Sequence, residues 1–140
     1  MILTETVLLD TPAESRFLNI ISAAIEAYLE RVPEIDEREM IIYNLKLAAQ
    51  ECCTNIIDHS YAEGSGGRIG VCLTVLREPR RLVVEFRDTG SSVEPATVTE
   101  PQLTVGSVRG YGLFLMHELM DEVNYSQDER GNCWRLEKFL

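Results

Sequence analysis

Three polar side chains whose spacing places them on one helical face could do chemistry within residues 37–59. Glu51, Asn55 and Asp58 follow one another at i, i+4 and i+7, beside the apolar stripe of the same segment and not opposite it. A carboxylate can act as a general base, and an amide oxygen is a hard neutral ligand for Mg²⁺. The same spacing also fits a solvated helix face with an incidental Asn55, and spacing alone favours that plainer interpretation.

Two glycine-containing segments offer further polar groups. Asp88 follows an apolar β-branched run, and Gly90 then lets the backbone turn sharply, so the carboxylate could reach a ligand. An ordinary Asp-x-Gly turn explains the same residues. The segment 106–112 (GSVRGYG) opens a helix, where backbone N–H groups and the helix dipole favour an anion and Arg109 could add a charged fork. A flexible linker that ends in a helix cap is the alternative there.

The other candidates for reactive side chains are two histidines and four cysteines. His59 stands four residues after Asn55 and could reach the same cleft, whereas His117 is expected at or near the surface of the last helix. Neither histidine has a nearby Ser or Cys partner that signals a catalytic triad. The cysteines form no C-x-x-C pair, and they predict small buried side chains in a reducing cytoplasm, not a zinc site: Cys52, Cys53, Cys72 and Cys133.

Apolar periodicity predicts the elements that must position these residues. The first helix is expected to begin at a capping box over residues 11–14, and the second, capped over 36–39, to run from about 37 to 59. A third helix is expected over 111–120, and strands over 4–9, 69–76, 82–86, 122–126 and 133–139. Residues 88–109 form a long loop, which in a compact domain is usually functional. Three helices and about five mostly antiparallel strands indicate an α+β fold, a two-layer α/β sandwich.

The composition bounds the class of protein. The 140 residues are 45% hydrophobic and 26% charged, which suits one folded domain over residues 1–140. With 23 acidic against 13 basic residues the net charge is −10, which argues against nucleic acid or an anionic membrane as a direct partner. No apolar run approaches the ~20 residues of a membrane span, and the first ten residues lack a signal-peptide pattern. An anionic ligand held locally by backbone amides is compatible with this charge.

The order and spacing of the three segments carry more information than any one of them. Residues 51–61 (ECCTNIIDHSY) resemble the N box of the GHKL, or Bergerat-fold, ATPases, in the variant typical of anti-sigma factor serine kinases of the RsbW and SpoIIAB type. Residues 88–90 (DTG) resemble the G1 box, and residues 109–123 resemble the G2 box and its helix. Gly131-Asn132 resembles the closing element before the last strand. The resemblance covers nearly the whole chain.

The resemblance implies roles for the residues of the long helix. Glu51 would be the general base that activates a substrate serine hydroxyl, and Asn55 would coordinate the Mg²⁺ that bridges the ATP phosphates. His59 stands where the family often has a His or Lys, and it is carried over as a nucleotide-binding position without a defined role. The fold implied is a mixed, mostly antiparallel sheet with helices on one face.

The resemblance also implies contacts to the nucleotide outside that helix. Asp88 would accept the adenine amino group, with Gly90 letting the purine approach. Arg109, Gly110 and Gly112 would contact phosphates from the lid and the start of the last helix. The chain departs from the family pattern in two ways: Ser92 replaces the second glycine of the G1 box, and residues 91–108 contain no Lys or Arg. Phosphate charge would then fall on Mg²⁺, Arg109 and backbone amides.

These resemblances lead to one favoured function and an alternative. The favoured function is a cytoplasmic, homodimeric, ATP- and Mg²⁺-dependent serine-protein kinase, which would phosphorylate a STAS-domain anti-anti-sigma protein and sequester a sigma factor or similar target. The alternative is a non-catalytic module of the same fold that binds nucleotide or protein and inhibits by sequestration. Ser92 favours the module, whereas Glu51 and Asn55 favour the kinase. A detached catalytic domain of a histidine kinase is a third, less favoured interpretation.

Overall fold

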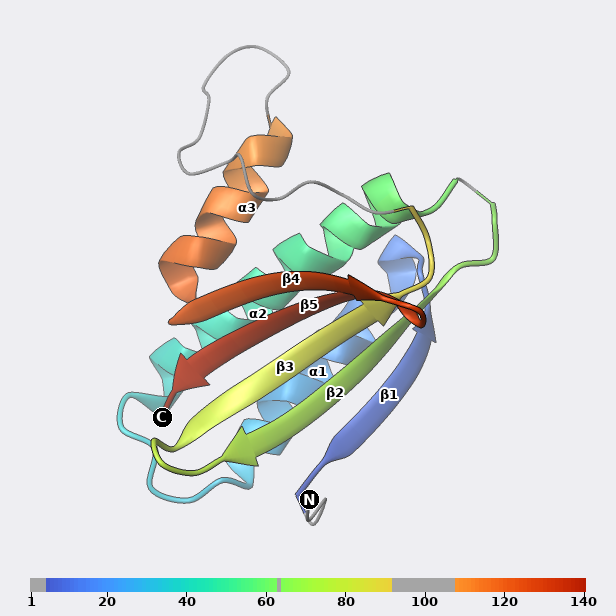
Figure 1. Ribbon diagram of the computed structural model, residues 1–140. Coiled ribbons are helices and arrows are strands. Elements are labelled where there is room, and N and C mark those ends of the chain that lie inside the picture. Colours follow the sequence, from blue (N-terminus) through green and yellow to red (C-terminus); the bar gives the residue numbers. More distant parts are fainter. Residues whose placement is uncertain (1–4, 63, 92–107) are drawn as a thin grey trace.

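A five-stranded sheet covered by helices on one face forms the molecule in the computed structural model, which describes residues 5–62, 64–91 and 108–140 (Figure 1). The strand order is β1-β2-β3-β5-β4. The strands are β1 Val7–Pro12, β2 Arg68–Leu76, β3 Arg81–Asp88, β4 Glu122–Asp128 and β5 Gly131–Phe139. All four pairings within the described residues are antiparallel, so this part of the sheet is antiparallel throughout, where the resemblance implied a mixed, mostly antiparallel one.

In the part of the chain that the structure describes, three helices supply the second layer. They are α1 Leu18–Glu30, preceded by the 3₁₀ turn η1 Ser15–Phe17, then α2 Arg38–Asn55, which continues as the π-helical turn η2 Ile56–Ser60, and α3 Val108–Leu119. Helices α1 and α2 lie behind the sheet, and α3 lies alongside α2 near β4 (Figure 1). This arrangement confirms the predicted α+β two-layer sandwich.

A single hydrophobic cluster joins the two layers. Alternate residues of β2, β3 and β5 point to the helices and are almost fully buried, as the period-2 pattern predicts. They meet buried side chains from all three helices, among them Ile25, Leu45 and Met116. Burial of each large aliphatic or aromatic side chain stabilises the fold by about 1.5–3 kcal/mol relative to exposure. The long predicted stripe of residues 37–59 is therefore real, and it fixes α2 with one face against the sheet.

The predicted N-terminal capping box is wrong. Thr11 and Pro12 end β1, and the helical region begins only at Ser15, with no side-chain cap from Glu14. The strand continues because Pro12 pairs opposite Arg68 and the Ala13 amide donates to the Gly67 carbonyl at 2.9 Å. Proline is tolerated there because β1 is an edge strand. Sheet pairing outweighs the local capping preference, and the first strand lies about three residues later than predicted.

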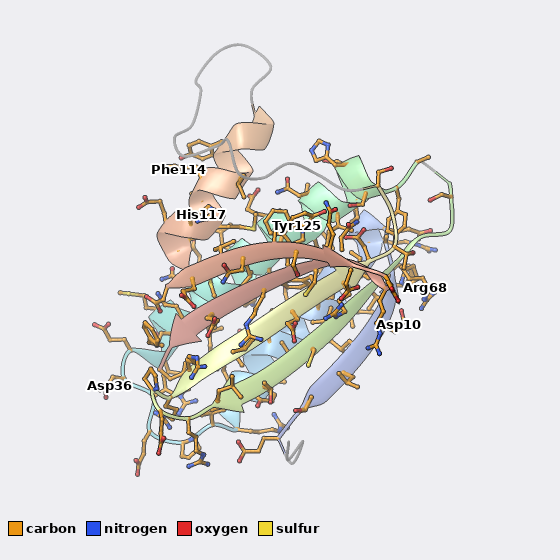
Figure 2. All side chains as sticks on the ribbon, in the orientation of Figure 1. Asp10, Asp36, Arg68, Phe114, His117 and Tyr125 are labelled. Atoms are coloured by element: carbon orange, nitrogen blue, oxygen red, sulfur yellow. The ribbon has the colours of Figure 1, made fainter. Side chains whose placement is uncertain are left out.

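The second capping box is also wrong. The residue that precedes α2 is Glu37, in the left-handed region with φ +53°, and it makes no side-chain cap. Asp36 is exposed at the end of the molecule opposite the tip of α3 (Figure 2). The entry to α2 is instead fixed by Arg38, whose guanidinium donates to the Leu29 carbonyl at the end of α1. Tertiary contact between two helices replaces the predicted local cap.

The remaining element predictions are confirmed with small shifts. Helix α3 begins three residues earlier than predicted, and the two hairpins β2–β3 and β4–β5 form as expected. Three cysteines are buried and Cys72 is half-buried, and burial raises the pKa of Cys53 to about 12. Among the described residues, no helix is both long and apolar enough to cross a bilayer.

Candidate functional site

The predicted site residues gather where α2 and η2 meet α3 and the end of β3. Helix α3 packs along α2, which brings two of the predicted segments together. The third segment, Asp88 to Ser91, leaves β3 and is tied to η2, because the Ser91 amide donates to the Ser60 carbonyl at 2.6 Å. The start of β5 borders these residues as well, since Asn132 lies directly opposite Asp88 in the sheet register.

Glu51 and Asn55 face the first half of α3 across Gly112. Both side chains are half-buried and stand one turn apart on α2, and Gly112 is buried. A Cβ placed on Gly112 would lie 2.5 Å from Glu51 Oε2 and 4.0 Å from Asn55 Oδ1. The missing side chain at Gly112 therefore leaves room for the Glu51 carboxylate, which an added Cβ would displace. The arrangement holds a carboxylate and an amide oxygen side by side near the N-terminal half of a helix.

Asp88 ends β3 as a buried carboxylate with only 2% of its surface exposed. Its Oδ1 accepts hydrogen bonds from the Gly90 amide at 3.0 Å and from Asn132 Nδ2 at 2.8 Å. Its Oδ2 is buried and has no hydrogen-bond partner within the part of the chain that the structure describes. A buried acceptor without a partner costs about 1–3 kcal/mol, more when it is charged. Such an atom is typical of a functional site, and it suits a ligand that brings an N–H donor.

Two glycines allow the backbone to close around Asp88. A Cβ on Gly90 would overlap the Ser60 carbonyl, and a Cβ on Gly131 would overlap the Asp88 carbonyl oxygen. Gly131 also has φ +119°, in the region that favours glycine. The predicted role of Gly90, to let the purine approach, stays a prediction; what approaches Gly90 in the structure is the backbone of η2.

Tyr61 is a structural residue of the site to which sequence reasoning gave no role. Its hydroxyl accepts a hydrogen bond from the Thr89 amide at 2.8 Å and donates one to the Arg68 carbonyl at 2.8 Å. Its ring lies over Gly67, where a Cβ would come within 2.5 Å of the ring carbons. Tyr61 thus joins η2 to both β2 and β3.

Asp58 does not share the cleft with Glu51 and Asn55. The π-helical turn begins at Ile56, so the i+7 spacing no longer keeps Asp58 on the same face. Asp58 is exposed and lines a separate hollow of about 610 Å³, together with Tyr61 and the glycine-rich loop over residues 64–67. Next to it, His59 is half-buried in the same π turn. The nucleotide-binding position assigned to His59 stays a prediction.

The described residues cover the G2 segment only in part. Arg109 and Gly110 lie in the first turn of α3, and their surroundings lie outside what the structure describes. Ser92 and the rest of the predicted lid, up to residue 107, also lie outside the described residues. Further along α3, His117 is exposed, as predicted for a surface histidine, and it lies one turn after Phe114 (Figure 2).

A larger hollow lies elsewhere on the molecule. A groove of about 830 Å³ runs between α1 and α2, lined by residues such as Glu26, Tyr43 and Lys46. Lys46 donates to Glu26 at 3.2 Å across it. None of the predicted site residues lines this groove, and its size alone does not make it the chemical centre. The buried Asp88 carboxylate and the Glu51–Asn55 pair remain the candidates for the chemical centre.

Comparisons with known proteins identify the family of the chain. The model of the family described as "Histidine kinase-like ATPase domain" matches residues 11–138. A serine-protein kinase RsbW of Bacillus subtilis is 33% identical over 92% of this chain and 82% of its own length. Another RsbW, of Halalkalibacterium halodurans, is 28% identical over 97% of this chain and 84% of its own.

Solved structures show the same fold at lower identity. The RsbU and RsbW domains of Rv1364c from Mycobacterium tuberculosis align with a TM-score of 0.68 at 17% identity, over 96% of this chain and 32% of that one. The SiaB–SiaC complex from Pseudomonas aeruginosa aligns with a TM-score of 0.60 at 16% identity, over 96% of this chain and 88% of that one. With a family model that spans most of its length and a relative at 33% identity, this chain belongs to the histidine kinase-like ATPase domain family, in the group of the serine-protein kinase RsbW.

Proposed function

We propose that this protein is an ATP- and Mg²⁺-dependent serine-protein kinase that acts as an anti-sigma factor. It transfers the γ-phosphoryl group to a serine of a STAS-domain anti-anti-sigma protein, and it sequesters a sigma factor or similar target when that partner is phosphorylated. The observation that carries the proposal is the pairing of the Glu51–Asn55 face with Gly112, beside a buried Asp88 Oδ2 that lacks a donor among the described residues. The names of the relatives at 28–33% identity support the same activity.

The purine end of the site fits adenine. Asp88 Oδ2 is an acceptor without a donor in the described part of the chain, and the exocyclic amino group of adenine is a donor. The other carboxylate oxygen is already held by Gly90 and Asn132, so the carboxylate cannot turn freely. Asp88 therefore binds the adenine amino group in this proposal, with the Asp88–Gly90 turn beneath the ring.

The phosphate end fits a magnesium-bound triphosphate. Mg²⁺ usually keeps several waters and takes one or two protein oxygens together with substrate phosphates, so a single amide ligand such as Asn55 is sufficient. Backbone amides in the first turn of α3, with Arg109, Gly110 and Gly112, offer donors to phosphate oxygens. When bound, Mg·ATP supplies the group to be transferred, and the protein's share is positioning and charge stabilisation.

Glu51 is the general base in this proposal. Its carboxylate lies against the α3 backbone at Gly112, one helical turn from Asn55, which holds it beside the proposed phosphate end. It accepts the hydroxyl proton of the incoming serine as the serine oxygen bonds to the γ-phosphorus and the bond to the departing ADP breaks. The pKa values of the neighbouring Cys52 and Cys53 thiols are raised by burial, so these thiols stay protonated and do not compete as nucleophiles.

The biological setting is proposed from the same resemblance. We place the protein in the cytoplasm as a homodimer, with a STAS-domain protein as phosphate acceptor and neither nucleic acid nor membrane as a direct partner. The net charge of −10 supports the last point, because a phosphate backbone would be repelled. His59 is proposed to contribute to the nucleotide site from its half-buried position in η2.

Labelled phosphate transfer tests the proposal. Purified protein is incubated with γ-labelled ATP, Mg²⁺ and STAS-domain proteins of the same genome, alongside Glu51→Ala and Asn55→Ala. The exposed Glu39→Ala on the same helix is the matched control. The proposal predicts label on a serine of one STAS protein, lost in both site variants and kept in the control. Nucleotide binding without transfer to any STAS protein contradicts the kinase and supports the non-catalytic module.

A further inference from the structure

The groove between α1 and α2 takes no part in the proposed phosphoryl transfer. Its volume is about 830 Å³, and it is lined by residues of α1 between Asn19 and Glu30 and by residues of α2 between Arg38 and Gln50. Figure 1 shows the two helices side by side behind the sheet. At about 1.5 Å per residue each of these stretches is about 17 Å long, so roughly three turns of another helix can lie along the groove.

The middle of the groove is apolar and open. On α1 the wall is made of small side chains, Ser22 and Ala23, which leave space between the two helices. On α2 the wall is made of Ile42, Tyr43 and Leu47. Tyr43 is 66% exposed, and a tyrosine ring supplies a large contact area at a low cost in side-chain entropy. The middle of the groove therefore offers a partner an apolar surface with one aromatic anchor.

The end of the groove next to the α1–α2 connection is acidic. Glu30 and Glu39 line it and are exposed, and neither forms an ion pair within the described residues. The two cations that line the groove already have partners, because Arg38 donates to a backbone carbonyl of α1 and Lys46 donates to Glu26 at 3.2 Å. The two carboxylates at this end are therefore available to a cationic group of a partner.

The surroundings of this end add to its negative charge. Residues 30–39 contain five acidic residues and two arginines. Arg80, from the β2–β3 hairpin, adds a third guanidinium, which donates to two carbonyls of this stretch. Five carboxylates against three guanidiniums leave an excess of negative charge, whereas Asn19 and Gln50 at the other end are neutral. The groove is therefore complementary to a partner that combines apolar side chains with basic ones.

Two other occupants fit this groove less well. A second copy of the chain carries a net charge of −10, which opposes its contact with an acidic surface. A ligand that carries phosphate is opposed by the same carboxylates. A basic amphipathic helix meets both requirements, because its apolar side chains at i, i+3, i+4 and i+7 lie in a groove while its basic side chains reach the rim.

We propose that the α1–α2 groove binds an amphipathic helix of a partner protein, whose apolar side chains pack on Tyr43 and whose basic side chains pair with Glu30 and Glu39. The Lys46–Glu26 pair spans the groove with both side chains half-exposed, so the incoming helix displaces it at little cost.

The groove is independent of the proposed catalytic site. Glu51 lies against α3 at Gly112, with Asn55 one turn further along α2, whereas the groove lies on the side of α2 that faces α1. A helix bound in the groove leaves the nucleotide site open. The inference therefore goes beyond the proposed function and does not depend on it.

Peptide binding tests the inference. The probe is a fluorescein-labelled synthetic helix of about 15 residues, with leucines at i, i+3, i+4 and i+7 and lysines at both ends, so that either direction of binding brings lysines to Glu30 and Glu39. The control peptide has the same composition in scrambled order, which keeps the charge and removes the apolar stripe. Fluorescence anisotropy at about 0.15 M salt should show at least about tenfold tighter binding of the ordered peptide.

The apolar contact is tested at an exposed position of α2. Tyr43→Ala should lower the affinity for the ordered peptide at least about fivefold, as the loss of an aromatic anchor does. Met40→Ala is the matched control, since Met40 is an exposed apolar residue of the same helix that does not line the groove. It should change the affinity less than about twofold.

The charged contact is tested by reversing the two carboxylates. Glu30→Lys with Glu39→Lys should lower the affinity for the ordered peptide at least about tenfold, because attraction becomes repulsion. Glu118→Lys with Glu129→Lys changes the net charge equally at exposed positions of α3 and of the β4–β5 turn. This control should lower the affinity less than about threefold, because salt screens charges that are far from the groove.

Amide chemical shifts locate the bound peptide. In isotope-labelled protein the shifts that change on binding should gather on residues 19–30 and 38–50, and they should still do so at saturating Mg·ATP. Changes that gather on the sheet or on α3 overturn the inference.

The remaining outcomes separate this inference from the proposed function. An ordered peptide that binds no more tightly than the scrambled one overturns the inference, and so does unchanged affinity in Tyr43→Ala or in the double lysine variant of the groove. These groove variants should transfer phosphate at the wild-type rate. A protein that transfers no phosphate and still binds the ordered peptide in the groove supports the inference and contradicts the proposed function alone.

Discussion

At the scale of single residues, three glycines determine how closely the parts of the site pack. Because these residues carry no side chain, the Glu51 carboxylate can lie against α3 at Gly112 and the Ser60 carbonyl can contact Gly90. In the same way, β5 can approach β3 at Gly131. The sequence predicted Gly90 and Gly112 as functional, but for approach to a nucleotide. The structure adds approach to other parts of the protein, which the sequence could not reveal because the partners are remote along the chain.

Replacing Gly112 tests whether the space it leaves for the Glu51 carboxylate matters for activity. In Gly112→Ala the added methyl meets the end of a flexible carboxylate, so Glu51 moves and the fold survives. Alanine is the better helix former by about 1 kcal/mol, so the free energy of unfolding should fall little or rise. The rate of serine phosphorylation should fall at least about tenfold, because the base is displaced.

The control for this change is Gly70→Ala in β2, where a Cβ makes only ordinary contacts. Urea unfolding and single-turnover transfer are measured for both variants. A Gly112→Ala protein with wild-type transfer rates would show that the position of Glu51 against α3 does not matter.

At the scale of elements, predictions from local sequence signals were wrong wherever a tertiary contact favoured another conformation. The helices and hairpins followed the predicted periodicity, but both capping boxes failed, one to strand pairing at Pro12 and the other to the Arg38 contact with α1. The π-helical turn was not predicted, because it adds one residue per turn without any apolar signature. It separates Asp58 from Glu51 and sets the Ser60 carbonyl and the Tyr61 hydroxyl against the strand ends.

Removal of the Tyr61 hydroxyl should loosen the junction of η2 with the sheet. Tyr61→Phe deletes one donor and one acceptor and leaves the Thr89 amide without this partner. We expect a loss of about 1–2 kcal/mol in the free energy of unfolding, together with faster hydrogen exchange at Thr89. The exposed Tyr43→Phe is the control and should change neither. Unchanged hydrogen exchange at Thr89 in Tyr61→Phe would show that the Tyr61 hydroxyl does not hold η2 to the sheet.

The open face of the sheet should give a pH-dependent contribution to stability. Burial alone raises the pKa of Glu137, but the hydrogen bond from Arg81 at 2.7 Å, with help from Glu122 and Arg135, outweighs it and lowers the pKa. A lowered carboxyl pKa in the folded state stabilises the protein above the unfolded value of 4.5, and the contribution is lost as pH falls through the folded value.

Arg81→Leu tests whether the contribution of Glu137 to stability falls with pH in this direction. The substitution should cost about 1 kcal/mol at pH 7, where partial exposure screens the pair, and less at a pH below both pKa values of Glu137. Urea unfolding of wild type and variant at pH 7 and at about pH 3 measures the difference. Arg16→Leu removes an exposed ion pair with Glu14 and serves as the control. An equal cost of Arg81→Leu at both pH values would contradict the assignment.

At the scale of the whole molecule, an acidic chain can still hold an anionic ligand. In the proposed site the donors to phosphate are chiefly backbone groups at the start of α3, so a net charge of −10 is compatible with an anionic ligand. Fold class and the candidate residues of α2 and β3 could be predicted, because they follow periodicity and motif order. The asymmetry of the Asp88 oxygens could not, because it depends on the register of β3 against β5.

Ligand binding should stabilise the entire fold. At about 100 times its dissociation constant, Mg·ATP should add about 2.7 kcal/mol to the free energy of unfolding. For a chain of this length that corresponds to a rise of about 9 °C in Tm. Differential scanning fluorimetry measures it, with Asp88→Ala expected to lose most of the rise. A wild-type Tm that does not move at saturating Mg·ATP contradicts a nucleotide site of any kind.

The most direct test of the central claim is the single-turnover rate of phosphoryl transfer in Glu51→Gln, set against its affinity for ATP. Glutamine keeps the shape of the side chain but cannot accept the serine proton, so we expect a rate lower by about 10²–10⁴-fold with the dissociation constant for ATP within about threefold of wild type. Glu39→Gln, an exposed change on the same helix, should retain both values. A Glu51→Gln protein that phosphorylates the STAS serine at the wild-type rate would contradict the role of Glu51 as the general base.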